Sequence, residues 1–242
     1  MTNPIVVVPA RLGAGRLPGK PLLDVAGEAL IVHVWRRAVE AGIGPVLVAA
    51  ADAGIIAAVE AAGGLAVLTD PDLPTGSDRV AAAVAAIDPA GRHDAVVNLQ
   101  GDLPTIAPGS IAAVLEPLAD PAFDMATLAG PLAEAALDDP HIVKVMVDDH
   151  GRALDFRRPR PGRPASRHVG VYAFRRAALQ RYAALPRSPR EIDESLEQLR
   201  AMEHGMRIGV RIVEDEAPAV DTAAGLEAVR RVLVSRRTSG SS

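Results

Sequence analysis

The sequence contains no cysteine, which excludes disulfide bonds, thiolate metal sites and a cysteine nucleophile. Aromatic residues make up only 2% of the chain, so we expect a core of Ala, Val, Leu and Ile. No apolar run reaches the roughly 20 residues that a membrane span needs. The first residues, MTNPIVVVPAR, are too short and too soon charged for a signal peptide. We therefore expect a soluble, cytoplasmic protein.

The chain also lacks a strong excess of charge. Its formal net charge is −4, and its basic residues are not interleaved with aromatic ones, so nucleic acid is not an expected partner. With 242 residues, 49% of them hydrophobic, the chain is long enough for one well-packed domain. We predict a single domain over residues 1–235 and a flexible tail over residues 236–242.

Apolar runs and helical segments alternate in the first half, which indicates right-handed βαβ units and a parallel sheet. The second half is richer in strands and predicts a mixed-sheet extension over residues 124–175, for acceptor and dimer contacts. The fold class is therefore α/β: a Rossmann-like, mostly parallel sheet flanked by helices. The predicted strands are Pro4–Pro9, Pro45–Ala50, Ala66–Leu68, Ala95–Leu99, Asp124–Ala129, Ile142–Asp148, Ala153–Phe156, Val169–Phe174 and Arg207–Val213. The predicted helices are Ala29–Ala41, Ile55–Ala62, Ser77–Ile87 with Ser77 as its cap, Ala177–Ala184, Glu191–His204 and Thr222–Arg236.

A loop rich in glycine and basic residues follows the first strand. It reads PARLGAGRLPGKPL, from Pro9 to Leu22, and contains Arg11, Arg16 and Lys20. Glycines let backbone N–H groups approach phosphate oxygens, and the three cations add positive charge at the sheet edge where α/β proteins bind ligands. The loop is neither a Walker loop nor a dinucleotide-binding fingerprint, because Ala14 and Pro18 stand where glycines would be required. A solvated turn with scattered cations is the alternative.

Six motifs in order resemble those of the 3-deoxy-manno-octulosonate (Kdo) cytidylyltransferases, also called CMP-Kdo synthetases. They are the basic loop, TGSDR at Thr75–Arg79, NLQGDLP at Asn98–Pro104, RHVGVYAF at Arg167–Phe174, ESLEQLR at Glu194–Arg200 and VDT at Val220–Thr222. The resemblance covers almost the whole chain. It implies a nucleotidyltransferase (GT-A-like) fold and a reaction that transfers CMP from CTP to an acidic acceptor and releases pyrophosphate.

The resemblance also assigns nucleotide-binding residues. The catalytic set is Arg11, Arg16, Lys20 and Asp102. Thr75–Arg79 corresponds to the segment that reads the base, with a plain helix cap as the alternative. The nucleotide-binding set as a whole is Pro9, Ala10, Arg11, Gly13, Arg16, Lys20, Thr75, Gly76, Ser77, Arg79, Gln100 and Gly101.

Two aspartates lie where strands end. Asp102 follows the strand Ala95–Leu99, and Asp221 stands between the last strand and the last helix. Phosphoryl transfer from a nucleoside triphosphate uses Mg²⁺ held by one or two carboxylates, and the family uses the matching aspartates for this. We therefore predict Mg²⁺ on Asp102 and Asp221, and Asp102 could also help to deprotonate the acceptor. The alternatives are a turn residue for Asp102 and a helix cap for Asp221.

On the acceptor side, the family's pattern and the local charge select Arg158, Arg160, His168, Tyr172, Glu197 and Gln198. The sequence departs from the family at Ala14, at Leu103 where the family has Glu, and between Phe156 and Arg167, which looks shortened and rich in Arg and Pro. Guanidinium groups bind carboxylate and phosphonate oxygens in bidentate pairs. We therefore predict a small anionic acceptor such as the phosphonate phosphonoformate, in natural-product biosynthesis. The alternative is that these arginines form a solvated surface loop.

Other functions remain open at this point. The first alternative is CMP-Kdo synthesis for lipopolysaccharide, and a lower one is an inactive nucleotide-binding paralogue. A related glycosyltransferase is a further, less favoured alternative. The expected partners are CTP, the acceptor and a second copy of the chain in a homodimer.

Overall fold

The computed structural model describes residues 3–13, 17–162, 164–215 and 217–239, with side chains as far as residue 235. Its strands are β1 (Pro4–Ala10), β2 (Asp24–Val25), β3 (Glu28–Ala29), β4 (Val46–Ala50), β5 (Leu65–Leu68), β6 (Ala95–Leu99), β7 (Met125–Gly130), β8 (Lys144–Val147), β9 (Ala153–Arg157), β10 (Ser166–Arg175) and β11 (Ile208–Ile212). Its α-helices are α1 (Leu30–Glu40), α2 (Ala53–Ala61), α3 (Gly76–Ile87), α4 (Pro108–Ala113), α5 (Arg176–Ala184), α6 (Pro189–Glu194), α7 (Gln198–Glu203) and α8 (Ala223–Ser239).

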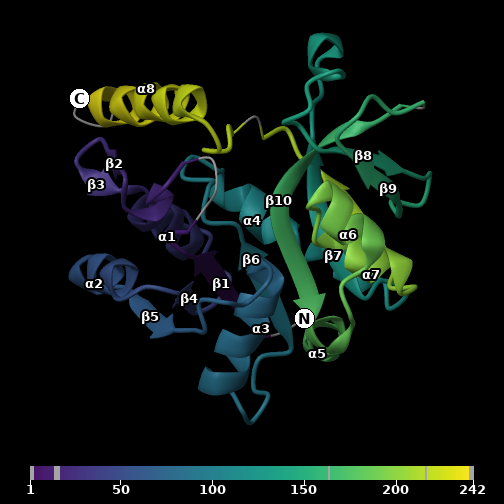
Figure 1. Ribbon diagram of the computed structural model, residues 1–242, viewed down its shortest axis with the longest axis horizontal. Coiled ribbons are helices and arrows are strands. Elements are labelled where there is room, and N and C mark those ends of the chain that lie inside the picture. Colours follow the sequence, from purple (N-terminus) through teal and green to yellow (C-terminus); the bar gives the residue numbers. More distant parts are fainter. Residues whose placement is uncertain (1–2, 14–16, 163, 216, 240–242) are drawn as a thin grey trace.

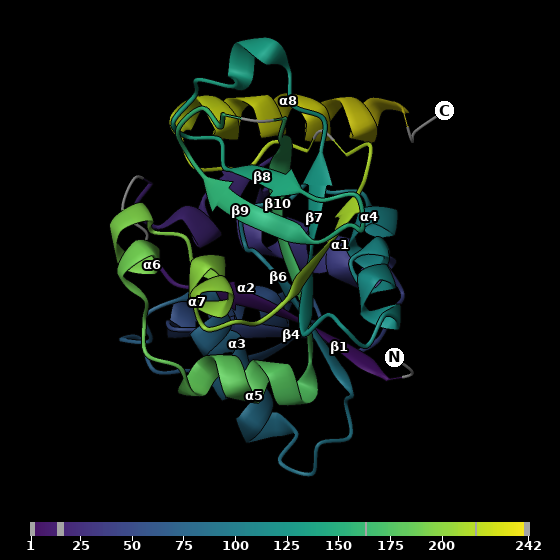
Figure 2. The same ribbon diagram turned by 90° about the vertical axis from the view of Figure 1, so that its right-hand side faces the viewer.

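One mixed sheet organises the molecule (Figure 1). Its main path runs β11-β7-β10-β6-β1-β4-β5. The β1, β4, β5 and β6 strands pair in parallel, as do β7 and β11, whereas β10 is antiparallel to both β6 and β7. The β8–β9 hairpin pairs with the start of β10 and lies beside its upper part in Figures 1 and 2. The predicted α/β class and mostly parallel sheet are confirmed.

The reversed direction of β10 determines where the functional cleft forms. Val171 of β10 pairs with Leu99 at the end of β6, so the first residues of β10 lie beside the loop that leaves β6. The loop after β1 leaves the same edge, because β1 and β6 are parallel neighbours. Segments that are 160 positions apart in the sequence therefore meet at one edge of the sheet, as ligand sites of α/β folds do.

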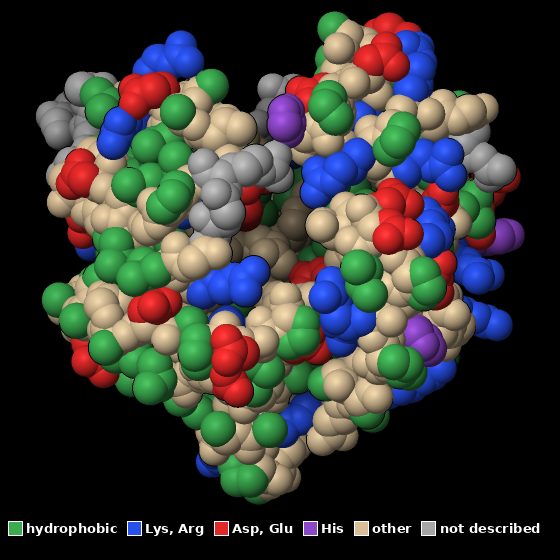
Figure 3. All heavy atoms as spheres, in the orientation of Figure 1, with side chains coloured by type: hydrophobic (Ala, Val, Ile, Leu, Met, Phe, Trp, Pro, Cys, Tyr) green, Lys and Arg blue, Asp and Glu red, His purple; other side chains and the backbone are tan. Residues whose placement is uncertain are grey.

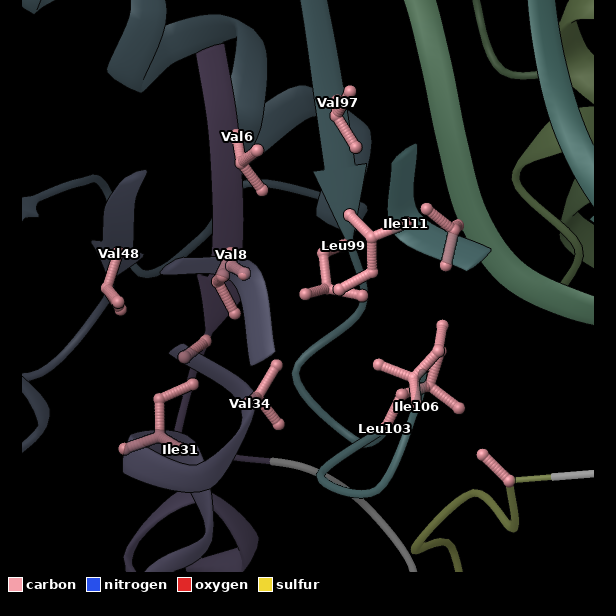
Figure 4. Packing of buried hydrophobic residues seen from close by; sticks show 14 of the residues in the cluster. Val6, Val8, Ile31, Val34, Val48, Val97, Leu99, Leu103, Ile106 and Ile111 are labelled. Carbon is pink, nitrogen blue, oxygen red and sulfur yellow. The ribbon is translucent and has the colours of Figure 1, made fainter. Parts of the chain in front are cut away.

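Apolar side chains cover both faces of the sheet, because parallel central strands are buried on both sides. Val6, Val8, Val97 and Leu99 face α1, α2, α4 and α8 in one aliphatic cluster. Figure 4 shows these side chains pointing toward Ile31 and Val34 of α1 and toward Ile111 of α4. The opposite cluster contains Ile5 and Val7 and packs against α3, α5 and α7.

The second cluster departs from the expected all-aliphatic core. Phe156, His168, Tyr172, Phe174 and Tyr182 form a chain of ring contacts with centroids 5.2–6.4 Å apart. A chain with few aromatic residues thus places four of them together. Two of these rings, Tyr172 and His168, also line the cleft described below.

Three local predictions differ from the structure. The helix expected over Glu191–His204 is two short helices, α6 and α7, because Ser195 takes a left-handed conformation (φ 52°) between them. The cap of α3 is Thr75, whose side chain accepts a hydrogen bond from Asp78 N, and not Ser77. The last helix continues to Ser239, into the segment expected as a tail. Among the described residues, no helix combines the length and apolar character needed to cross a membrane.

Candidate functional site

The basic loop turns back toward the sheet through Gly19. Gly19 has φ 69°, a left-handed conformation that glycine adopts without strain, and it precedes the short helical turn Lys20–Leu22. Arg11 and Lys20 line a cleft with Pro9 and Ala10 at the end of β1. Gly13, also predicted to bind nucleotide, is exposed outside the cleft lining. Arg16 lies outside the described residues.

Lys20 joins the two predicted metal-binding aspartates. Its Nζ donates to Asp102 Oδ2 at 3.3 Å and to Asp221 Oδ1 at 3.1 Å. The Lys20 side chain is 14% exposed, against 22% for Asp102 and 42% for Asp221. Two carboxylates that are 119 positions apart in the sequence therefore converge on one cation, the Lys20 ammonium. The sequence had placed Mg²⁺ on these aspartates and had not paired them with Lys20.

Backbone bonding explains this convergence. Val220 N donates to the carbonyl oxygen of Asp102 at 2.9 Å and so places the segment before α8 against the loop after β6. Thr222 Oγ1 accepts from Gly225 N at 3.1 Å and thereby caps the first turn of α8. Because Thr222 supplies the cap, the Asp221 carboxylate remains directed at Lys20, and the alternative of Asp221 as a helix cap is wrong.

Burial changes the electrostatics of this junction. Burial raises the pKa of Asp102; Lys20 opposes the shift and Asp221 adds to it. Burial also disfavours the charged form of Lys20, but its two carboxylate partners raise the pKa of Lys20 above the ordinary value. The ammonium therefore stays protonated and holds together two carboxylates that would otherwise repel each other.

The start of α3 contributes the opposite wall. Thr75, Gly76 and Arg79 line the cleft, and Arg79 donates to the carbonyl oxygen of Asp70 at 2.9 Å. Ser77 does not line it, because its buried hydroxyl accepts from Asn98 Nδ2 at 3.0 Å. The segment is thus a helix cap that also lines the cleft, and its role in reading the base stays a prediction.

Gln100 connects the two halves of the cleft. Its Nε2 donates to Glu197 Oε1 at 2.8 Å, and Ser77 N donates to Glu197 Oε2 at 2.9 Å. Glu197 is thereby held by donors from two other segments, although burial raises its pKa. The next residue, Gly101, packs against the end of β1. A Cβ atom added to Gly101 would lie 2.9 Å from the carbonyl oxygen of Pro9. Only glycine fits at that position without displacement of β1.

Most of the predicted acceptor residues line a second, larger lobe of the same cleft. Tyr172 donates its hydroxyl to Gln198 Oε1 at 3.0 Å, and the Gln198 Nε2 is buried without a hydrogen-bond partner in the structure. An orphaned buried donor beside a cavity is a group that a polar ligand satisfies. The lobe is lined by Arg158, His168, Tyr172, Glu197 and Gln198.

His168 is held in one tautomer by its neighbours. Thr127 Oγ1 donates to the carbonyl oxygen of Val171 at 2.7 Å, so it must accept from His168 Nε2, which lies 3.0 Å away. His168 Nδ1 is then an acceptor. Burial lowers the pKa of His168 to about 3, with Arg167 and Arg158 adding like charge. The imidazole is therefore neutral at physiological pH.

The neutral histidine makes the stability of the fold depend on pH. Unfolded His168 takes up a proton below about pH 6.5, whereas the folded side chain stays neutral down to about pH 3. The unfolded state therefore binds more protons in this window, and stability falls as pH decreases, by roughly 1 kcal/mol per pH unit for this one group. Urea denaturation should show a shallower pH dependence for His168→Asn than for the unmodified chain. Equal pH dependence of the free energy of unfolding in the two proteins would contradict this role of His168.

Arg160 does not belong to the site. Its guanidinium pairs with Glu134 Oε1 at 2.5 Å and with Asp138 Oδ2 at 2.9 Å on the surface, and it is absent from the cleft lining. Arg157 likewise pairs with Asp155. Local acidic partners thus neutralise two arginines of the segment Arg157–Arg167. Among the arginines of this segment that the structure describes, only Arg158 and Arg167 line the larger lobe.

The two lobes form one continuous cleft, because both are lined by Arg11, Thr75, Gly76, Gln100 and Asp102. Their volumes are about 180 Å³ on the nucleotide side and about 610 Å³ on the acceptor side. Figure 3 shows the molecule hollowed at its centre, with basic and acidic side chains around the hollow. Lys20 and its two aspartates occupy the junction of the lobes: Lys20 lines the smaller lobe, Asp221 the larger one, and Asp102 both.

The comparisons with known proteins agree with this geometry. The model of a protein family described as "Cytidylyltransferase" matches residues 5–208. The 3-deoxy-manno-octulosonate cytidylyltransferases of Methylorubrum populi and Methylobacterium radiotolerans are each 55% identical to this chain, over 98% of its length and 99% of theirs.

This chain belongs to the CMP-Kdo synthetase family of cytidylyltransferases.

Its fold matches a solved member of the same family. The structure of a CMP:2-keto-3-deoxy-manno-octonic acid synthetase complexed with CTP has a TM-score of 0.89 and 40% sequence identity, and the match covers 97% of this chain and 99% of the other. The chain is accordingly a CTP-dependent nucleotidyltransferase, as the motifs predicted. The comparisons give no support to a phosphonate-accepting subtype.

Several residues of the CMP-Kdo synthetase cleft escaped the sequence analysis. Arg187, Glu191 and Ser195 line the acceptor lobe from α6 and its flanks. Arg187 and Glu191 lie outside the six motifs. Ser195 lies inside the motif Glu194–Arg200, but the motif does not show that its backbone breaks the helix between α6 and α7. Leu103, noted only as a departure from the family, is a buried residue of the same lobe.

Proposed function

We propose that this chain transfers CMP from CTP to Kdo and releases pyrophosphate. The observation that carries the proposal is the junction in the cleft, where Lys20, Asp102 and Asp221 meet between a basic loop and a polar cavity. The names of the two relatives that are 55% identical over nearly the whole chain support Kdo as the acceptor.

The reaction assigned to this cleft is an in-line displacement. An acceptor hydroxyl oxygen forms a bond to the α-phosphorus of CTP, and the bond between that phosphorus and the bridging oxygen to the β-phosphate breaks. Arg11 and Lys20 stabilise the charge of the phosphates, and the same role is proposed for Arg16. The hydroxyl proton passes to a base, for which we propose Asp102. Pyrophosphate leaves with the electron pair of the broken bond.

Magnesium fits the residues at the junction. Asp102 and Asp221 already converge on one cation, the Lys20 ammonium, and carboxylate oxygens are the ligands that Mg²⁺ prefers. The described residues contain no group of three or more metal-binding side chains, which suits an ion that takes its other ligands from water and substrate phosphates. When bound, Mg²⁺ would neutralise charge that develops on the transferred and leaving phosphates.

The acceptor lobe favours a polyhydroxylated acid over a small phosphonate. It offers a phenol, an amide, a neutral imidazole and a carboxylate, from Tyr172, Gln198, His168 and Glu197. These are the groups that hydroxyl recognition needs. The relatives are also matched over 99% of their length, which argues against a large deletion in this chain's acceptor side.

A pyrophosphate-release assay tests the proposal. With CTP and Mg²⁺, we expect fast release with Kdo and none above background with phosphonoformate or without an acceptor. Mass spectrometry should identify the nucleotide product as CMP-Kdo, and this result is required to support Kdo as the acceptor. Efficient turnover of phosphonoformate with Kdo ignored would restore the phosphonate hypothesis, and no release with any acceptor would favour the inactive paralogue.

Charge reversal distinguishes the two arginines that the sequence treated alike. Arg158→Glu should raise the acceptor KM roughly tenfold or more, the cost of losing a charged hydrogen bond, with little change in the KM for CTP. Arg160→Glu is the matched control and should leave both values near those of the unmodified chain, because Arg160 pairs with Glu134 and Asp138 outside the cleft. Equal effects of the two substitutions on the acceptor KM would contradict the placement of Arg158 inside the cleft and Arg160 outside it.

The homodimer and the cytoplasmic location remain proposals. The mixed extension around the β8–β9 hairpin leaves apolar residues such as Leu154 at its surface, 40% exposed, where a second copy could pack. Sedimentation of the purified chain would give the oligomeric state.

A further inference from the structure

A buried guanidinium links the two lobes of the cleft from behind. Arg200 on α7 is 2% exposed. Its Nη1 and Nη2 donate to Asp78 Oδ1 and Oδ2 at 2.7 and 3.0 Å. Its Nε and Nη2 donate to Glu191 Oε2 and Oε1 at 2.9 and 2.6 Å. One side chain therefore binds two carboxylates in a bidentate manner, each from a different helix.

Each carboxylate leads to a different lobe. Asp78 is in the first turn of α3, and its Oδ2 accepts from Thr75 Oγ1 at 2.7 Å; Thr75 lines the nucleotide lobe. Glu191 is on α6, lines the acceptor lobe and accepts from Arg187 Nε at 3.0 Å. The bonds from Thr75 to Arg187 thus run without a gap through Arg200.

The third contact of Arg200 reaches the acceptor segment itself. Its guanidinium carbon lies 4.5 Å from the centre of the Tyr182 ring, within cation–π range. The Tyr182 hydroxyl donates to the carbonyl oxygen of Glu197 at 3.1 Å, and the Glu197 carboxylate accepts from Ser77 N on α3. The segment from Glu191 to Arg200 is therefore tied to the start of α3 at two points, although the two are more than a hundred residues apart.

The network is not explained by stability alone. A buried ion-pair network of this kind is often no more stable than an apolar replacement of the same volume. Arginine is suited to it because its planar fork binds two carboxylates at fixed angles, which lysine cannot do. What the network provides is a fixed position of α6 and α7 relative to the start of α3.

We propose that Arg200 is a positioning residue that couples the acceptor lobe to the nucleotide lobe. Arg200 touches neither substrate; it acts through Asp78 on Thr75 and through Glu191 on the acceptor lobe. Nucleotide bound against the start of α3 then orders α6 and α7, and the acceptor meets a preformed site. This inference rests on the proposed function for the nucleotide subsite and does not depend on which acid is the acceptor.

Hydrogen exchange on the full chain tests the coupling without turnover. CTP with Mg²⁺ and no acceptor should protect amides in residues 75–79 and also in residues 189–203. In Arg200→Lys, which keeps the charge and loses the fork, protection should persist at 75–79 and vanish at 189–203. Arg190→Lys is the matched control on α6, because the ion pairs of Arg190 are with Asp155 and Glu194 and not with Asp78 or Glu191. It should behave as the unmodified chain does.

Kinetics give a second readout. Arg200→Lys should raise the KM for the acceptor at saturating CTP about tenfold, within the usual range of coupling between sites, with little change in the KM for CTP. If Arg200→Lys does not fold, the double variant Asp78→Asn with Arg200→Gln removes both charges together, leaves Glu191 its partner Arg187, and should show the same loss of protection at 189–203.

Two results would overturn the inference. One is protection at 189–203 that survives unchanged in Arg200→Lys or in the double variant. The other is protection of the unmodified chain that is confined to 75–79. Absence of CTP protection at 75–79 in the unmodified chain is a different outcome, which contradicts the proposed nucleotide site and this inference with it.

Discussion

Replacing Asp102 by asparagine is expected to lower kcat by about a thousandfold, the size of effect seen when a group that stabilises transition-state charge is removed. Asp102 stands at the junction of the lobes, 3.3 Å from Lys20, where we place one of the two magnesium ligands. Asparagine keeps the shape but loses the charge, so the phosphates lose electrostatic stabilisation as the bond to pyrophosphate breaks. Asp221→Asn should also lower kcat, by a smaller factor, because Asp221 is more exposed.

The same substitution should not unfold the protein. Burial raises the pKa of Asp102, which means that the ionised carboxylate is disfavoured there, and a neutral amide avoids that penalty. The melting temperature of Asp102→Asn should therefore equal or exceed that of the unmodified chain. Asp72→Asn is the control, since Asp72 is exposed in the loop before α3. Near-normal turnover of Asp102→Asn with Mg²⁺ would remove Asp102 from the mechanism.

The sequence predicted those parts of the site that local patterns encode. Strands with mostly apolar runs, such as Ala95–Leu99, coincide with observed strands, and the motif at the carboxyl end of that strand supplies Gln100 and Asp102 to the cleft. The direction of β10 is not encoded locally, yet it brings His168 and Tyr172 to the same edge. Before the structure, only the resemblance to the family's motifs grouped them with the other predicted site residues.

Residues whose roles depend on distant partners could not be predicted. Arg160 and Arg158 are two positions apart in one basic loop, but Glu134 and Asp138 neutralise the first while the second lines the cleft. Local charge density therefore overestimated the basic character of the acceptor side and led to the phosphonate hypothesis. Arg200 was likewise hidden, because its partners lie 9 and 122 positions away.

Lysine is rare in this chain, and the surroundings of Lys20 give a physical reason for its presence at that position. The chain has 26 basic residues, and Lys20 and Lys144 are its only lysines. Lys20 lies between two carboxylates, and Lys144 donates to the carbonyl oxygens of Asp139 and Arg158 at 2.5 and 2.6 Å. Both sites hold a compact ammonium with several acceptors around it, which the larger, planar guanidinium would not fit.

Replacing Lys20 by methionine is therefore expected to have two opposite effects. The kcat/KM for CTP should fall about a hundredfold or more, because the cleft loses a cation at the phosphate subsite while the repulsion of Asp102 and Asp221 for the triphosphate remains. Without nucleotide, the same variant should bind Mg²⁺ or Mn²⁺ more tightly than the unmodified chain, because a divalent cation replaces the ammonium between the two carboxylates. Calorimetric titration with MnCl2 and thermal melting with MgCl2 measure this second effect independently of activity.

The comparison with arginine separates charge from shape. Lys20→Arg keeps the positive charge, so it should not gain divalent-ion affinity, but its fork cannot occupy the place of the ammonium 3.1–3.3 Å from both aspartates, and its activity should fall with that of Lys20→Met. Asp221→Asn combined with Lys20→Met should abolish the gain in Mn²⁺ binding, because only one carboxylate then remains. If Lys20→Met binds Mn²⁺ no better than the unmodified chain, Asp102 and Asp221 are partners of Lys20 alone, and the proposed metal site has to be sought elsewhere in the cleft.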